Sequence, residues 1–180
     1  RRGEPRRLPA KTTSWQRWAE RLAVYAQSEA VRAELPVWRA MGSGGALPVP
    51  VDRTGGAATV ASSRTVQVAL GVETTRALLQ DVPEVYRTQI NDVLVAALVQ
   101  TLAGWTGTRT VRVALEGHGR EEIGEGLDLS RTVGWFTTLF PVELRLPAGA
   151  AGEVLKGVKE QLRRVPNHGL GYGLLRYLHE

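Results

Sequence analysis

The sequence predicts an α/β fold in which helices cover a mixed sheet. Short runs with apolar residues at every second position predict strands, longer runs with apolar residues at helical spacing predict helices, and the two patterns alternate along the second half of the chain. The 180 residues are enough for one ordinary domain or for one lobe of a larger protein. We expect a lobe, because the chain begins with arginine rather than methionine and ends within a helical pattern.

Composition removes several classes of function. The chain has no cysteine, which excludes disulfides, thiolate metal sites and cysteine nucleophiles and fits a reducing cytoplasm. No apolar run of about 18 residues and no signal peptide pattern supports a membrane protein or secretion. The net charge is +5, and four of the first seven residues are arginines. No nucleic-acid motif accompanies them, so a solvated connector is favoured over a nucleic-acid patch.

The first 40 residues predict helices after an extended connector. Thr13 and Gln16 have the spacing of a capping box. Four apolar residues that follow at helical spacing are expected to anchor the core: Trp15, Trp18, Leu22 and Tyr25. Ser28 is expected to cap a second, shorter helix that reaches Trp38 and is disturbed by Pro36.

A linker is expected at residues 41–63, where glycine and proline cluster. Apolar alternation over residues 66–70 then predicts a strand. A short helix is expected at about 74–80, and a longer one at about 89–105 with Gly107 as its stop. The residues expected to share the apolar face of the longer helix are Ile90, Val93, Leu94, Ala97, Leu98 and Leu102.

A second strand is predicted over residues 110–115, with Glu116 on the face opposite its apolar row. Residues 117–130 are expected to form a glycine-rich, acidic loop. A further strand is expected at 136–146, partly broken by Pro141.

The chain is expected to end in two helices separated by a tight loop. The first covers about residues 152–165. The residues of this helix expected to face inward are Val154, Leu155, Val158 and Leu162. Residues 166–173 predict a loop that exposes its backbone before the final helix begins.

The stretch 116–137 holds the strongest candidate site. Glu116 lies where a strand stops and glycines replace bulk, so the backbone can approach a ligand closely. A carboxylate there, flanked by His118 and Arg120, fits a general base. A structural carboxylate paired with Arg112 or Arg120 is the alternative.

Other polar residues are expected to lie outside the site. Glu121 and Glu122 are predicted to be solvated. His168 and His179 have neither the spacing nor the carboxylate neighbours of a metal pair, and we expect both at the surface.

Segments of this chain, taken in order, resemble the epimerization domains of nonribosomal peptide synthetases, which are relatives of the condensation domains. The first is Leu-Pro-Ala-Lys-Thr-Thr-Ser at 8–14 with Trp-Ala-Glu-Arg at 18–21. Four family motifs follow: Asn-Asp-Val-Leu-Val-Ala-Ala at 91–97, Glu-Gly-His-Gly-Arg-Glu at 116–121, Arg-Thr-Val-Gly-Trp-Phe-Thr at 131–137 and Pro-Asn-His-Gly-Leu-Gly-Tyr-Gly at 166–173. Four collinear motifs are a far more specific signal than one.

The resemblance implies a truncated domain. The family's His-His-x-x-x-Asp-Gly motif would precede residue 1, and its closing Phe-Asn-Tyr motif would follow Glu180. Residues 1–40 would then be the tail of an N-terminal lobe, 41–63 an inter-lobe linker and 64–180 the C-terminal lobe. The implied fold is like that of chloramphenicol acetyltransferase, with two similar lobes in a V and the active site in a tunnel between them.

The implied reaction is inversion of the α-carbon of an aminoacyl or peptidyl thioester. The substrate is carried on the phosphopantetheine arm of a peptidyl carrier protein, and the N-terminal lobe of the same domain is the second partner. No partner nucleic acid or membrane is implied. The reaction needs no metal, pyridoxal phosphate or nicotinamide, and no motif for any of them appears.

The resemblance also implies roles for single residues. Glu116 is one acid/base group, and the second histidine of the absent double-histidine motif is its counterpart. His118 is expected to brace the loop more than to act directly. Arg120 would pin Glu116 as a carboxylate or support the enolate oxygen, with a structural ion pair as the alternative.

The other carried-over residues are expected to line a substrate and pantetheine tunnel. Trp135 and Phe136 would line or support it, and Arg131 would bridge the two lobes. Tyr172, between Gly171 and Gly173, has a backbone free to approach the pantetheine arm. A plain tight turn explains the same residues.

Two other functions fit the sequence. One is a condensation domain of the dual type, which epimerizes and also forms the amide bond. The other is a noncatalytic module that docks the carrier protein, whose fold and arginine surface would remain while the chemistry was lost. An intact Glu116 loop favours the epimerase over both.

Overall fold

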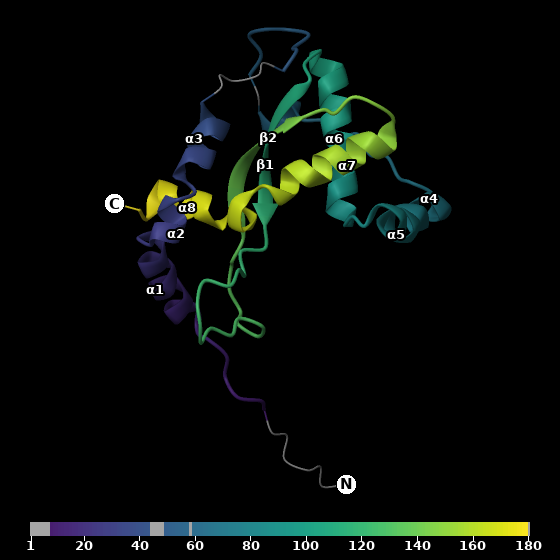
Figure 1. Ribbon diagram of the computed structural model, residues 1–180. Coiled ribbons are helices and arrows are strands. Elements are labelled where there is room, and N and C mark those ends of the chain that lie inside the picture. The colour runs from purple at the N-terminus through teal and green to yellow at the C-terminus, as the bar shows by residue number, and fades with distance from the viewer. Residues whose placement is uncertain (1–7, 44–48, 58, 180) are drawn as a thin grey trace, which may run out of the picture. The chain divides into compact units, whose positions relative to one another are not determined.

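The computed structural model of the protein describes residues 8–43, 49–57 and 59–179, and the chain divides into two compact units (Figure 1). The arginines predicted to form a solvated connector, at positions 1, 2, 6 and 7, lie outside the described residues. The first unit gathers Arg1–Gly44, Ala114–Val142 and Val165–Glu180, and the second gathers Gly45–Val113 and Glu143–Arg164. The first forty residues therefore share a unit with the motif segments, and their assignment to an N-terminal lobe stays a prediction.

Three short helices open the first unit. They are α1 (Trp15–Ala26), α2 (Glu29–Arg32) and α3 (Leu35–Gly42). The cap of α1 is Ser14 rather than Thr13, because the Ser14 hydroxyl accepts the Arg17 N–H while Gln16 donates to Glu20 instead of the backbone. Ser28 caps α2 as predicted. The predicted second helix is split in two, and Pro36 lies in the first turn of α3, where the backbone N–H that proline lacks has no partner within the helix.

An apolar cluster holds the first unit together. Its buried members are Trp18, Ala26, Val31, Ile123, Phe136, Leu170 and Leu174. Trp18 is fully buried, as expected of a core anchor, whereas Trp15 is 41% exposed and lies edge-on to the Phe136 ring at 4.7 Å. The cluster thus packs the N-terminal helices against the segment that contains the Arg-Thr-Val-Gly-Trp-Phe-Thr motif.

Two strands, β1 (Thr110–Gly117) and β2 (Thr138–Arg145), pair in an antiparallel sheet. The Leu146 N–H donates to the Arg109 carbonyl at 2.7 Å, and at the other end Gly117 lies against Thr138. Pro141 does not break β2, because a strand at the edge of a sheet can lack one backbone donor. The sheet therefore runs without interruption up to the candidate site.

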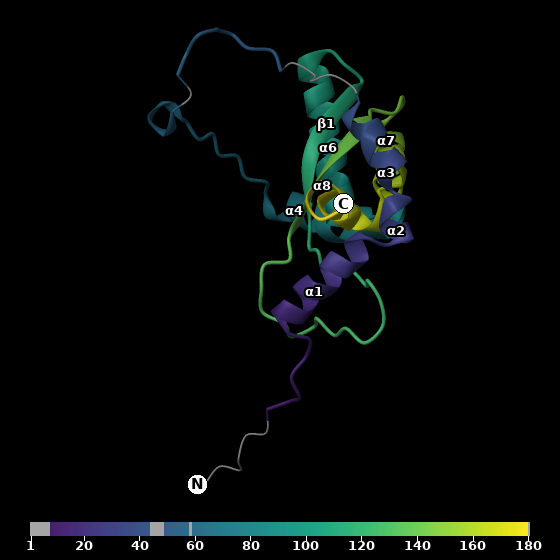
Figure 2. The same ribbon diagram turned by 90° about the vertical axis from the view of Figure 1, so that its left-hand side faces the viewer.

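The strand predicted at residues 66–70 is absent. Val66 and Val68 are each 89% exposed, and apart from η1 (Val60–Ser62) the described residues from 49 to 71 have no regular structure (Figure 2). Apolar alternation produces a strand only where another strand pairs with its backbone, and no described strand pairs with this segment. The predicted mixed sheet is thus an antiparallel pair within the described residues.

The segment 166–173, predicted to be a loop, consists of a short 3₁₀ helix and the first turn of an α-helix. It contains η3 (Pro166–Gly169), and α8 (Leu170–Tyr177) begins directly after it. Gly169 has a φ of +86°, and a Cβ atom there would lie 2.0 Å from the Phe140 ring. A Cβ atom at Gly171 would lie 1.9 Å from the Glu34 carboxylate. Gly169 and Gly171 therefore permit close packing at the start of α8.

The second unit is mainly helical. Its elements are α4 (Val72–Arg76), the π-helix η2 (Ala77–Asp81), α5 (Val82–Tyr86), α6 (Ile90–Thr106) and α7 (Ala151–Arg163). Its buried cluster contains Ala96, Val154, Leu155 and Val158, so the predicted inner face of α7 is confirmed. Gly107 ends α6 in the left-handed conformation, also as predicted. No helix of the described chain is both long enough and apolar enough to cross a membrane.

The predicted apolar face of α6 is only partly right, since Val93 packs against the buried cluster and Leu94 and Leu98 do not. Leu94 is 56% exposed and Leu98 42% exposed. The buried residues are Ala96, Val99 and Ala103, which lie on a neighbouring face. Small residues allow the backbones of two helices to approach closely, and Ala96 belongs to the cluster that includes α7. Apolar residues occur on all sides of α6, so their spacing could not select the face that packs. The small side chains of the buried face made that choice.

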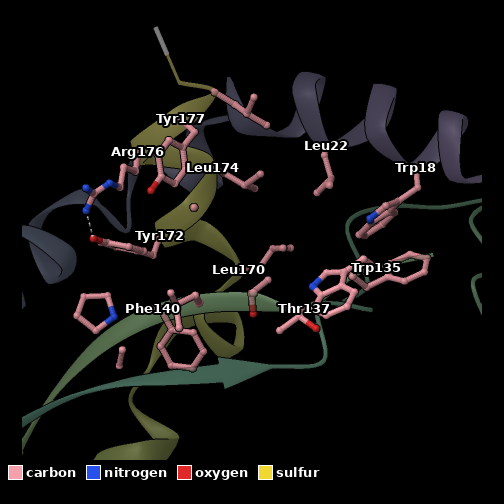
Figure 3. Close-up of a pocket in the computed structure, with 18 of the residues that line it drawn as sticks. Trp18, Leu22, Trp135, Thr137, Phe140, Leu170, Tyr172, Leu174, Arg176 and Tyr177 are labelled. Atoms are coloured by element: carbon pink, nitrogen blue, oxygen red, sulfur yellow. Dashed lines mark hydrogen bonds between the residues drawn. The ribbon is translucent and has the colours of Figure 1, made fainter. Parts of the chain in front are cut away.

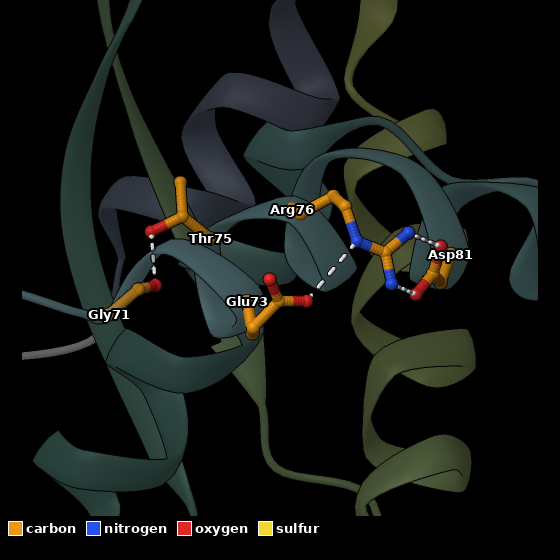
Figure 4. A network of polar contacts seen from close by, with 5 residues as sticks. All are labelled: Gly71, Glu73, Thr75, Arg76 and Asp81. Atoms are coloured by element: carbon orange, nitrogen blue, oxygen red, sulfur yellow. Dashed lines mark hydrogen bonds and ion pairs between the residues drawn. The ribbon is translucent and has the colours of Figure 1, made fainter.

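Polar contacts stabilise α4 and η2 (Figure 4). The Arg76 guanidinium donates two hydrogen bonds to the Asp81 carboxylate, at 3.0 and 3.1 Å, and also pairs with Glu73 at 3.6 Å. The Thr75 hydroxyl donates to the Gly71 carbonyl at 3.0 Å. These side chains are exposed, so we expect each pair to contribute little to the free energy of unfolding.

The exposed apolar segment at residues 66–70 is expected to make the isolated chain self-associate. Val66 and Val68 present apolar side chains to water beside backbone that no described strand pairs. We expect the isolated 180-residue chain to self-associate, as judged by sedimentation velocity. Val66→Thr combined with Val68→Thr should shift the distribution toward monomer, whereas a monodisperse, cooperatively melting wild-type monomer would contradict the prediction.

The protonation of Glu34 is expected to make the stability of the folded protein depend on pH. Glu34 is buried, and burial raises its pKa above the ordinary value, although the hydrogen bond from the Trp38 indole at 2.9 Å acts in the opposite direction. A raised folded-state pKa means that the folded protein holds the proton more tightly than the unfolded chain. The stability that this proton contributes is present below the ordinary glutamate pKa and is lost as the pH rises through the raised value.

We therefore expect Glu34→Gln to raise the unfolding temperature of the intact parent domain at neutral pH and to flatten its pH dependence. Glutamine can still accept the Trp38 N–H bond. The measurement is a set of thermal melts between about pH 5 and 8. Glu29→Gln, at an exposed position of α2, is the control and should leave the profile unchanged. A lower melting temperature for Glu34→Gln at neutral pH would contradict the prediction.

Candidate functional site

The segment between β1 and β2 contains most of two motifs, at 116–121 and 131–137, and is fixed to the residues that precede α1. The Thr13 N–H donates to the Asp128 carbonyl at 2.8 Å, and the Asp128 N–H donates to the Thr13 hydroxyl at 2.9 Å. The buried Thr132 hydroxyl donates to the Thr13 carbonyl at 2.6 Å. Arg131, predicted to bridge two lobes, donates to the Ala10 carbonyl at 3.1 Å. Both segments belong to the first unit, so the motif is anchored within that unit.

Glu116 lies near the end of β1 with an exposed side chain. No hydrogen bond or ion pair joins it to any other residue that the structure describes. Arg112 and Arg120 are the two residues expected to pair with Glu116 if its role is structural. Arg112 instead forms an ion pair with Glu143 at 2.6 Å, and Arg120 donates hydrogen bonds to backbone carbonyls of the loop. Because strand residues alternate between faces, Glu116 shares its face with Ala114. The carboxylate is therefore open to a ligand on that face.

Arg120 holds the loop rather than Glu116. Its guanidinium donates to the carbonyls of Leu129 and Thr132, the latter at 2.9 Å. It also lies over the Phe136 ring, 3.8 Å from the ring centroid. These contacts join both ends of the loop to one side chain. The prediction that Arg120 pins the Glu116 carboxylate has no support in these contacts.

His118 has both ring nitrogens engaged. Its Nδ1 accepts the Arg120 backbone N–H at 3.0 Å, and its Nε2 faces the Glu121 carboxylate at 3.4 Å. The Glu121 side chain is only 11% exposed, so the prediction that it is solvated is wrong. His168 is 78% exposed, as predicted for a surface residue, and its Nδ1 lies 2.8 Å from the Glu121 carboxylate. The fold of the loop brings His118, Glu121 and His168 together. Their spacing in the sequence does not predict this contact.

These groups do not form a metal site. No three His, Cys, Asp or Glu side chains between residues 8 and 179, leaving aside 44–48 and 58, are grouped so that they could hold a metal ion. His179 instead lies 2.9 Å from the Ala26 carbonyl through Nδ1.

An apolar pocket of about 740 Å³ opens in the first unit, beside the same strand ends (Figure 3). Three of the predicted tunnel residues line it, namely Trp135, Phe136 and Tyr172. Trp135 is 81% exposed, and Phe136 is buried. Ala114 and Gly119, which flank Glu116 along the chain, also line the pocket. Glu116 itself is not a lining residue, but it shares its strand face with Ala114, which is one.

Tyr172 points into the pocket from α8, where a nearby arginine orients it (Figure 3). Its hydroxyl accepts a hydrogen bond from Arg176 at 2.7 Å. Its ring lies 5.5 Å from that of Trp38 in an edge contact. The residue belongs to a helix and not to the expected tight turn.

Several lining residues escaped the sequence analysis. Those that α8 contributes are Leu170, Leu174, Arg176 and Tyr177. Leu170 and Leu174 have i, i+4 spacing, which was the available signal for an apolar helix face. The expectation of a loop up to residue 173 concealed it.

Comparison with known proteins identifies the family. The family model for the condensation domain matches residues 1–180. A linear gramicidin synthase protein from Brevibacillus parabrevis is 53% identical over 99% of this chain, and chondramide synthase from Chondromyces crocatus is 50% identical over 97%. The chain spans only 2% and 4% of these two proteins.

Solved structures agree. The epimerization domain from the third module of tyrocidine synthetase B is similar with a TM-score of 0.86 and 37% identity, over 96% of this chain and 39% of that one. The first condensation domain of the calcium-dependent antibiotic synthetase is 24% identical with a TM-score of 0.68, over 97% of this chain and 40% of that one, and shows the fold alone. The predicted chloramphenicol-acetyltransferase-like α/β fold is confirmed. The chain belongs to the condensation domain family of nonribosomal peptide synthetases, as an epimerization-domain-like fragment.

Proposed function

We propose that this chain supplies one half of the active site of an epimerase that inverts the α-carbon of a carrier-bound aminoacyl or peptidyl thioester. The observation that carries the proposal is the Glu116 carboxylate. It is exposed, has no partner among the described residues and lies on the strand face that borders an apolar pocket. The likeness to the tyrocidine synthetase epimerization domain supports the same reaction.

The chemistry requires a base and an acid on opposite faces of the substrate. A thioester makes the α-proton removable, because the enolate oxygen carries the charge once the proton leaves. Glu116 takes the proton on one face, and a group outside this chain delivers a proton to the other. The double-histidine motif that precedes this segment in the family would supply that group. A positioned acid or base typically contributes a rate factor of about 10²–10⁴.

The pocket would hold the apolar part of the substrate and its thioester arm. Trp135 at the exposed side and Tyr172 on α8 offer flat surfaces for an extended chain. An apolar enclosure also removes water, which strengthens the electrostatic stabilisation of an enolate. Arg120 and His118 act by holding the Glu116 loop, since their polar atoms contact other parts of that loop.

The remaining partners follow from the proposed reaction. The peptidyl carrier protein would present its phosphopantetheine arm to the pocket, and the N-terminal lobe would complete the catalytic pair. No cofactor is proposed, because proton transfer to and from carbon activated by a thioester needs none.

The first test replaces the base in the intact parent protein. The carrier is loaded with an L-aminoacyl thioester in D₂O, and α-deuterium uptake is followed by mass spectrometry. Glu116→Gln should lower the rate of uptake by about 10²–10⁴-fold because glutamine cannot accept the proton. Glu125→Gln, an exposed glutamate of the same loop, is the control and should leave the rate unchanged.

A parent protein that forms D-product and loses this activity on Glu116→Gln supports the epimerase. Amide formation with a downstream acceptor, alongside exchange, would favour a dual condensation domain. A parent protein that takes up no deuterium while its carrier is loaded would favour the noncatalytic docking module.

A second test concerns the pocket. Trp135→Ala should raise the KM for the loaded carrier by about tenfold with a smaller change in kcat, because Trp135 offers contact area and no group that reacts. Trp105→Ala is the matched control, since Trp105 is also exposed but lies in the second unit. An unchanged KM for Trp135→Ala would contradict the assignment of the pocket.

A further inference from the structure

We propose that Glu121 is a positioning residue. It holds the loop that follows Glu116, residues 118–137, against the turn at residues 166–169. The inference rests on the proposed function, since it assigns Glu121 the task of holding the base in place. Glu121 itself lies outside the lining of the apolar pocket, so the proposed role is to act through Glu116 and not on the substrate.

The burial and contacts of Glu121 single it out. Its side chain is 11% exposed, although the glutamate next to it in sequence, Glu122, is exposed. Its Oε2 lies 2.8 Å from Nδ1 of His168. Its Oε1 is buried and makes no hydrogen bond, because Nε2 of His118 lies 3.4 Å away but is poorly aligned. One carboxylate thus lies between two imidazoles from distant parts of the chain.

The protonation of the two rings explains why a carboxylate suits this position. Nδ1 of His118 accepts a backbone N–H, so in the neutral ring the proton is on Nε2, which faces Glu121. His168 presents Nδ1 to Glu121 and donates from it. Residue 121 therefore makes one hydrogen bond, with His168, and a second imidazole N–H faces it at 3.4 Å, so a carboxylate suits the position because both of its oxygens accept and neither donates.

The contact ties together two strained or crowded segments. Asn167 and His168 have φ values of +45° and +47°, a left-handed conformation that other residues than glycine rarely adopt. A Cβ atom at Gly117 would lie 3.1 Å from the His168 carbonyl. The residue that follows Glu116 is therefore packed against the turn that Glu121 holds. Loss of the Glu121 contact would release both segments and let Glu116 move.

The main experiment compares two adjacent glutamates in the intact parent protein. Glu121→Gln keeps the shape but puts an amide NH₂ donor in place of one carboxylate oxygen, so one of the two imidazole N–H groups that face residue 121 must face another donor. We expect the kcat of α-deuterium exchange to fall about tenfold with KM unchanged, because the base is misplaced while the pocket is intact. Glu122→Gln should behave as wild type.

Two variants at the partner position sharpen the test. His168→Asn keeps a donor near the place of Nδ1 and tolerates a left-handed backbone, so it should retain most of the activity. His168→Gly fits the backbone but removes the donor, and should lower kcat about as much as Glu121→Gln. Combining Glu121→Gln with His168→Gly should cost less than the sum of the two single changes, since both act on the same contact.

A readout independent of activity is hydrogen–deuterium exchange of the backbone amides. In Glu121→Gln, peptides that cover residues 117–121 and 166–169 should lose protection together, whereas Glu122→Gln should change neither. Wild-type kcat and unchanged protection in Glu121→Gln would overturn the inference. If that variant fails to fold, His168→Gly with wild-type kcat and protection would overturn it equally. A parent protein that catalyses no exchange defeats the proposed function, while the amide protection still tests the lock.

Discussion

The loop between β1 and β2 closes on itself at Gly119, and the candidate site depends on that closure. A Cβ atom at residue 119 would lie 1.7 Å from the Phe136 carbonyl oxygen, and the φ of +69° is one that glycine adopts freely. Because the two ends of the loop touch there, Arg120 can reach over the Phe136 ring. Phe136 in turn packs against Trp15 and enters the core. A side chain at this position would force apart the segments that carry Glu116 and Trp135.

The charged residues of the motif have separate tasks. Arg120 satisfies backbone carbonyls of the loop, and Glu121 accepts from a histidine of a distant turn. The bond that Glu121 accepts matters because its side chain is largely buried, and a buried polar group that loses its partner costs about 1–3 kcal/mol. Glu116 alone among these charged groups is left without a partner in the described structure. A carboxylate that contributes nothing to holding the loop is free to contact a substrate.

Local rules predicted some helix ends and one helix face. Ser28 accepts the N–H of the first turn that a cap must satisfy, and Gly107 takes the left-handed conformation that ends a helix. The inner face of α7 followed from its spacing because that helix has one apolar side. The longer α6 is apolar all round, so spacing could not select the face with Ala96 and Val99 over the face with Leu94. Packing against other elements made that choice.

The sequence by itself determined the family, the helices with clear caps and the position of Glu116 at a strand end. Each of these depends on residues close together in the chain or on motifs that can be compared letter by letter. Only the tertiary structure decided that residues 66–70 form no strand among the described residues, and that His168 meets Glu121. Both outcomes depend on which distant segment lies alongside, and strand pairing and side-chain contacts of that range leave no periodic signal in one sequence.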